Sequence, residues 1–205
     1  MNSSQLKIVS FNIWDLPYWF VKNRQQRILQ IAEYLQRLDA EIVCLQESFD
    51  VYHRRLLYES LGSDKYYASG GFEAARKAPL ALFDTTGGLV IFSKFPIIQD
   101  KFVPFKQFTP SVIERIGRKG ILEATIKTPY GTIQVFNTHL HKEQKFFAHS
   151  IRVKQVKTIW NACKHNNMCL LSWLEISMKM RLWNKKICNH TAIKRPNALH
   201  TLRAL

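Results

Sequence analysis

Three polar side chains, Asn12, Glu47 and His139, lie at or near the ends of runs that are apolar enough to form strands. The runs cover 6–14, 41–46 and 132–137. Mg²⁺ takes few protein oxygens and keeps several waters, so Glu47 suits a carboxylate ligand and the Asn12 amide suits the ion or its bound water. Hydrolysis of a phosphodiester needs a metal and hydrogen-bond donors at the phosphate, which is the chemistry these residue types could support together.

Alternating strands and amphipathic helices surround these positions. The stretch 6–14 alternates like a strand, 23–38 places its apolar residues at helical spacing, and 41–46 is a short apolar strand. Asp50 fits the N-cap of a second helix better than a metal ligand. The other predicted elements are a helix at 51–61, a loop at 70–86, strands at 89–93, 97–105, 119–127 and 132–137, and a helix at 146–164. This order predicts a mixed α/β or α+β layered domain.

Four motifs carry a resemblance to a known family. They are Ser10-Phe11-Asn12-Ile13-Trp14, Leu45-Gln46-Glu47-Ser48, the segment from Gly87 to Ile97, and Asn137-Thr138-His139-Leu140-His141. Their order and spacing resemble the endonuclease/exonuclease/phosphatase superfamily over residues 6–165. The resemblance implies a four-layer sandwich of two mostly antiparallel sheets flanked by helices, incomplete at its C-terminal end. It also implies Mg²⁺ held by Glu47 and Asn12, with His139 as a catalytic donor to a nonbridging phosphate oxygen.

Details of the motifs resemble the neutral sphingomyelinase branch. They include the proline soon after Trp14, the aromatic–acid pair in Gln46-Glu47-Ser48-Phe49-Asp50, and Lys119-Gly120. The resemblance implies hydrolysis of a phospholipid such as sphingomyelin at a membrane surface. Tyr18 and Trp19, in the loop after the first motif, suit contact with a lipid substrate. The alternatives are an endonuclease of the same superfamily and a non-catalytic chain, which is either a pseudogene product or a binder of membrane or nucleic acid through charge.

Composition limits these alternatives only partly. The 205 residues carry a net charge of +15, which favours anionic partners such as nucleic acid, phosphate esters or acidic lipid. No run approaches the ~18 apolar residues of a transmembrane helix, so none is expected. The first residues lack the apolar core of a signal peptide. The chain as given is therefore expected in the cytoplasm, and a secreted protein is the alternative if a signal peptide precedes it.

The family pattern breaks after the last predicted helix. The resemblance predicts a Gly-Asp-x-Asn motif and then an Asp-His pair, but no aspartate follows Asp100. We therefore divide the chain into an N-terminal part of the family domain, 1–167, and an aberrant basic tail, 168–205. One back-translation of Trp173–Met180, read from its third base, encodes Val-Gly-Asp-Phe-Asn-Glu-Asn, which predicts a frameshift. The alternative is a divergent tail with a partner of its own. Without these motifs the 205-residue polypeptide is expected to be inactive.

Overall fold

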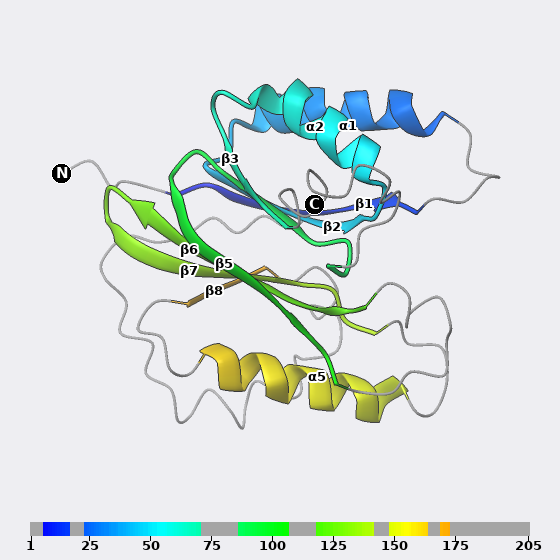
Figure 1. Cartoon of the computed structure of the whole chain (residues 1–205), viewed down its shortest axis with the longest axis vertical. Helices are drawn as coiled ribbons and strands as arrows, with labels where there is room; N and C mark the ends of the chain where they lie inside the picture. Colours follow the sequence, from blue (N-terminus) through cyan, green and yellow to red (C-terminus); the bar gives the residue numbers. More distant parts are fainter. Residues whose placement is uncertain are drawn as a thin grey trace.

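The computed structural model describes residues 6–16, 23–70, 86–106, 118–141, 148–163 and 169–172. Within them the chain forms four layers (Figure 1). Helices α1 (Arg24–Leu38) and α2 (Val51–Gly62) cover one sheet, a second sheet packs beneath it, and α5 (Ala148–Cys163) covers the outer face of the second sheet. The predicted layered sandwich is confirmed.

The first sheet has the strand order β1-β2-β4-β3. Its strands are β1 (Ile8–Asp15), β2 (Ile42–Ser48), β4 (Val90–Ser93) and β3 (Tyr67–Ser69). β1 and β2 are parallel and are joined through α1, whereas β4 is antiparallel to both β2 and β3. Parallel strands end at the same edge of a sheet, so the C-terminal ends of β1 and β2 lie together.

The second sheet has the order β5-β6-β7-β8. Its strands are β5 (Ile97–Pro104), β6 (Gly120–Thr128), β7 (Gly131–Thr138) and β8 (Cys169–Ser172). β5, β6 and β7 are antiparallel neighbours, and β8 runs parallel to β7. Each sheet is therefore mostly antiparallel, with one parallel strand at an edge.

Two strands were not predicted. β3 has only three residues, too few for a period to be recognised, and β8 lies just inside the predicted tail. Residues 71–85 of the predicted loop and 173–205 of the tail lie outside the described residues. The boundary at 167 stays a prediction.

Among the described residues, three apolar clusters hold the layers together. The first joins α1 and α2 to the first sheet and includes Ile28, Leu35 and Phe92. The second lies between the sheets, and the third joins the second sheet to α5 through Phe136 and Ile159. Because burial of apolar surface is the main favourable contribution to folding, these clusters fix the two sheets relative to each other.

The end of α1 is tied to the turn after β4. Asp39 ends the helix in a left-handed conformation, and Lys94 Nζ donates to Asp39 Oδ1 over 2.6 Å. The Lys94 hydrogen bond lowers the pKa of Asp39 below its ordinary value. A lowered carboxyl pKa adds stability above the unfolded-state pKa, and this stability is lost as the pH falls through the folded-state pKa.

Asp39→Asn should therefore lower the melting temperature slightly at neutral pH, and the difference from wild type should shrink below about pH 4. Asparagine tolerates the left-handed backbone, so the helix end is preserved. Thermal unfolding across this pH range measures the effect, and high salt should reduce it. A difference that stayed constant down to about pH 2 would contradict the assignment.

Candidate metal and phosphodiester site

Asn12, Glu47 and His139 converge at one end of the two sheets. Asn12 Nδ2 donates to Glu47 Oε1 over 3.0 Å, and His139 Nε2 lies 3.6 Å from the same oxygen. Asn12 comes from β1 and Glu47 from β2, while His139 directly follows β7 of the opposite sheet. His139 is 9% exposed and the Glu47 side chain 16%, so these two residues are largely sheltered from water. The three residues that the sequence selected are thus neighbours, and the roles given to them stay predictions.

An irregularity in β1 shapes this end of the site. Between the pairs Asn12–Gln46 and Asp15–Ser48, β1 has two residues where β2 has only Glu47. Such a bulge bends a strand and redirects its side chains. Both Trp14 (φ 48°) and Glu47 (φ 56°) adopt the left-handed conformation that non-glycine residues rarely use. The backbone of both strands therefore departs from regular geometry where the site begins.

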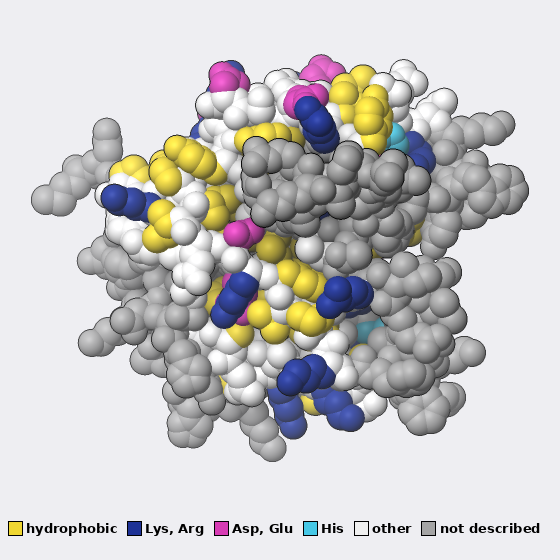
Figure 2. Space-filling model, viewed as in Figure 1, with side chains coloured by type: hydrophobic (Ala, Val, Ile, Leu, Met, Phe, Trp, Pro, Cys, Tyr) yellow, Lys and Arg dark blue, Asp and Glu magenta, His cyan; other side chains and the backbone are white. Residues whose placement is uncertain are grey.

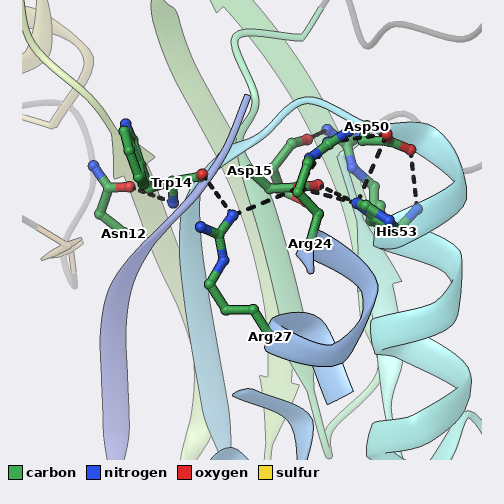
Figure 3. Close-up of polar contacts among 9 residues, drawn as sticks. Asn12, Trp14, Asp15, Arg24, Arg27, Asp50 and His53 are labelled. Atoms are coloured by element: carbon green, nitrogen blue, oxygen red, sulfur yellow. Dashed lines mark hydrogen bonds and ion pairs between the residues drawn. The ribbon is translucent and has the colours of Figure 1, made fainter. Parts of the chain in front are cut away.

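The bulge also fixes the Asn12 amide. The Trp14 backbone N–H donates to Asn12 Oδ1 over 2.9 Å, which leaves Nδ2 facing Glu47. Arg27 donates to the Trp14 carbonyl over 2.9 Å, and its guanidinium lies 5.7 Å from the centre of the Trp14 ring (Figure 3). Direct coordination of a metal by Asn12 Oδ1 would require the amide to turn over. In the orientation described, Asn12 fits better as a partner of Glu47 or of a metal-bound water.

Glu47 is the residue that best fits a metal ligand. Its Oε2 is buried and has no hydrogen-bond partner among the described residues, while Oε1 accepts from Asn12. A buried carboxylate oxygen without a partner is costly, and a bound cation would relieve that cost. A carboxylate oxygen is also a ligand that Mg²⁺ prefers, and an amide can hold a water bound to the ion. The residues present therefore fit the magnesium ion that the family resemblance implies.

A second charged cluster lies behind the bulge and was not predicted. Asp15, Asp50 and His53 offer ligand atoms within 4.8 Å of one another, so they could hold a cation. However, Arg24 already pairs with both acids, at 2.8 Å from Asp15 and 3.0 Å from Asp50 (Figure 3). His53 Nδ1 lies 3.0 Å from Asp15 Oδ1. With these partners in place, the cluster fits better as a set of ion pairs that joins β1, α1 and α2 than as a metal site.

The prediction for Asp50 is confirmed. It is the N-cap of α2, and its side chain accepts from the His53 backbone N–H over 3.1 Å. Asp15 and His53 were missed because nothing in their spacing links them. The available signals were an acid directly after a strand and a histidine one turn into a helix.

Backbone hydrogen bonds from nearby side chains support both halves of the site. Arg54, 2% exposed, donates to the carbonyls of Ser48 and Gly70, which secures the chain directly after Glu47. Lys119 donates to the Leu140 carbonyl, beside His139. The His141 backbone N–H donates to Gln155 of α5 over 3.0 Å. Tyr18 and Trp19, the predicted substrate-binding residues, lie outside the described residues.

Comparisons with known proteins found relatives of this chain. The model of the endonuclease/exonuclease/phosphatase family matches residues 9–169. The inositol phosphosphingolipids phospholipase C of Schizosaccharomyces pombe is 32% identical over 143 residues, which are 67% of this chain and 31% of that protein. The chain therefore spans about a third of the length of this curated relative.

Solved structures share the fold. Beta toxin from Staphylococcus aureus, crystallised with bound magnesium ions, superposes with a TM-score of 0.67 at 20% identity, over 89% of this chain and 70% of the toxin. Sphingomyelinase C from Streptomyces griseocarneus gives a TM-score of 0.62 at 18% identity, over 81% of this chain and 62% of that one. Since the family model covers most of its length, the chain belongs to the endonuclease/exonuclease/phosphatase family.

Proposed function

We propose that this chain carries part of the active site of a magnesium-dependent phosphodiesterase that acts on sphingomyelin or a related phospholipid. This part consists of Asn12, Glu47 and His139. The observation that carries the proposal is the buried, unpartnered Glu47 Oε2 beside Asn12 and His139. Bound Mg²⁺ would neutralise charge on the phosphate and stabilise the departing oxygen. The family resemblance and the phospholipase C relative support this class of reaction.

Each site residue has a separate task in this proposal. Glu47 would hold the ion through Oε2, and Asn12 would keep the carboxylate oriented through its 3.0 Å hydrogen bond to Oε1. His139 would donate from Nε2 to a nonbridging oxygen of the phosphate. Because its ring lies 3.6 Å from Glu47 Oε1, a phosphate on the metal side of Glu47 would be within reach of this donor.

The same proposal leaves the 205-residue polypeptide without a general base. The Asp-His pair that would activate water and the Gly-Asp-x-Asn motif are absent from the sequence. General acid–base catalysis contributes roughly 10²–10⁴-fold to a reaction rate. When catalytic groups act as a unit, removing one of them removes most of the contribution of the others. We infer that this polypeptide binds metal but hydrolyses phosphodiesters little above background.

A phospholipid is favoured over nucleic acid as the substrate. The net charge of +15 suits either. Figure 2 shows Lys and Arg side chains at several separate places on one face, next to hydrophobic side chains. Trp14, 54% exposed beside the site, and the predicted contacts of Tyr18 and Trp19 suit the boundary of a lipid layer better than a nucleic-acid backbone. No described helix has the length and apolar character needed to cross a membrane.

The test uses a version of the chain with its reading frame restored through the Gly-Asp-x-Asn and Asp-His motifs. With Mg²⁺, it should release phosphocholine from sphingomyelin vesicles faster than it nicks plasmid DNA at the same enzyme concentration. The 205-residue polypeptide is the matched control and should stay near background on both substrates. Nicking of DNA without release of phosphocholine would favour the endonuclease alternative. Activity of the 205-residue polypeptide that Glu47→Ala removes would show that other residues of this chain complete the site.

A further inference from the structure

A single amide, Asn137, joins the two sheets directly behind the site. It lies near the end of β7 in the second sheet and is fully buried. Its Nδ2 donates to the carbonyls of Leu45 in β2, over 2.8 Å, and of Val90 in β4, over 2.9 Å. One side chain of the second sheet therefore binds the backbone of two strands of the first.

Gln46 completes this contact from the other side. Its Nε2 donates to Asn137 Oδ1 over 2.7 Å and also lies 3.2 Å from Ser10 Oγ in β1. Asn137 thus uses both its donor and its acceptor groups on the first sheet. Hydrogen bonds in a buried network have well-defined geometry, because an unsatisfied amide there is costly.

The network adjoins the site residues on both sheets. Gln46 immediately precedes Glu47, and Asn137 is two residues before His139, so two contacts cross between the sheets in succession: Gln46–Asn137 and Glu47–His139. Successive side chains of a regular strand point to opposite faces. The left-handed backbone of Glu47 breaks this alternation and lets both Gln46 and Glu47 face β7.

We propose that Asn137 and Gln46 are positioning residues that keep Glu47 in its left-handed conformation and set its carboxylate against His139. A left-handed backbone is unfavourable for glutamate and persists only where its surroundings enforce it. Asn137 restrains the Leu45 carbonyl and Gln46 just before Glu47, and Arg54 restrains the Ser48 carbonyl just after it. The proposal rests on the proposed function only in taking Glu47 as the metal ligand.

The test compares Asn137→Leu, Gln46→Met and a control, Tyr66→Phe, in the 205-residue polypeptide. Tyr66 is also buried and donates to a backbone carbonyl, that of Ala40, over 2.9 Å, so the control removes a similar hydrogen bond away from the site. All three changes should lower the melting temperature. The first readout, without metal, is the nuclear Overhauser effect between the His139 ring and the Glu47 side chain. The second is the Kd for Mg²⁺, measured by calorimetry.

Asn137→Leu should abolish the His139–Glu47 Overhauser effect and raise the Kd about 10- to 100-fold, the usual cost of removing a group that orients a metal ligand. Gln46→Met should weaken the Overhauser effect and raise the Kd by a smaller factor. If Asn137→Leu does not fold, the result for Gln46→Met decides the test. Tyr66→Phe should change neither readout. Retention of the Overhauser effect and the wild-type Kd in a folded Asn137 or Gln46 variant would overturn the proposal. Failure of the wild-type polypeptide to bind Mg²⁺ would instead count against the proposed function, and the Overhauser effect would then decide this inference alone.

Discussion

Glu47→Gln should reduce the affinity of the chain for Mg²⁺ at least about 100-fold, because it removes the ligand itself, and groups that only orient a ligand already account for 10–100-fold. The substitution keeps the shape of the side chain and the oxygen that accepts from Asn12. It should also relieve the cost of a buried, unpartnered carboxylate oxygen. The variant should therefore be at least as stable as wild type in the absence of metal.

Calorimetry with Mg²⁺ and thermal unfolding with and without the ion together measure this effect. Wild type should gain stability on adding Mg²⁺, since a ligand of the folded state stabilises it by mass action, whereas Glu47→Gln should not. Glu59→Gln is the matched control, because Glu59 is exposed on α2 and pairs with Arg55 one turn away. An unchanged Mg²⁺ affinity in Glu47→Gln would rule Glu47 out as a ligand and would direct attention to the cluster of Asp15, Asp50 and His53.

Asp15→Ala should cause a large loss of stability, about 3 kcal/mol or more, because removing one partner of a buried ion pair leaves the other charge uncompensated. Asp15 is fully buried and accepts from Arg24 over 2.8 Å, and His53 Nδ1 lies 3.0 Å from its carboxylate. In the variant, Arg24 would lose Asp15 and keep its contact with Asp50. The N-terminal turns of both α1 and α2 would lose their common anchor on β1.

Chemical denaturation measures the loss, and Asp15→Asn should be intermediate because it keeps an acceptor but not the charge. Glu59→Ala breaks an exposed ion pair and should cost no more than about 1 kcal/mol. A loss below about 1 kcal/mol for Asp15→Ala would mean that Arg24 finds water or other partners, and that this charged cluster contributes little to folding.

The elements that the sequence predicted well are those with a clear period. The apolar spacing of Ile28, Ala32 and Leu35 predicts α1, and all three are buried. The four motifs located Asn12, Glu47 and His139, because residues at the ends of neighbouring strands are brought together whatever the intervening loops do. Asp50 was predictable because an N-cap is a local hydrogen bond within one turn.

Features that depend on distant parts of the chain could not be predicted from one sequence. Asp15 and His53 lie 38 residues apart, and Gln46 and Asn137 lie 91 apart, so no local pattern joins either pair. The bulge at Trp14 and the left-handed Glu47 arise where the register between β1 and β2 shifts by one residue. The sequence of either strand alone does not reveal such a shift. β8 is four residues long and depends on β7 for its hydrogen bonds, so it has little signal of its own.

The contacts that build the site also imply an order of assembly. Asn12 and Glu47 belong to one strand–helix–strand unit and are 35 residues apart, whereas the Gln46–Asn137 contact closes a loop of 91 residues. Loop-closure entropy grows only with the logarithm of length, so the longer closure costs less than about 1 kcal/mol more. The contact also joins two sheets, so we expect it to form only after both sheets are in place. A nascent chain would thus acquire the pair Asn12–Glu47 before His139 and Asn137 join it, and its affinity for a cation would reach its full value only once the second sheet has docked.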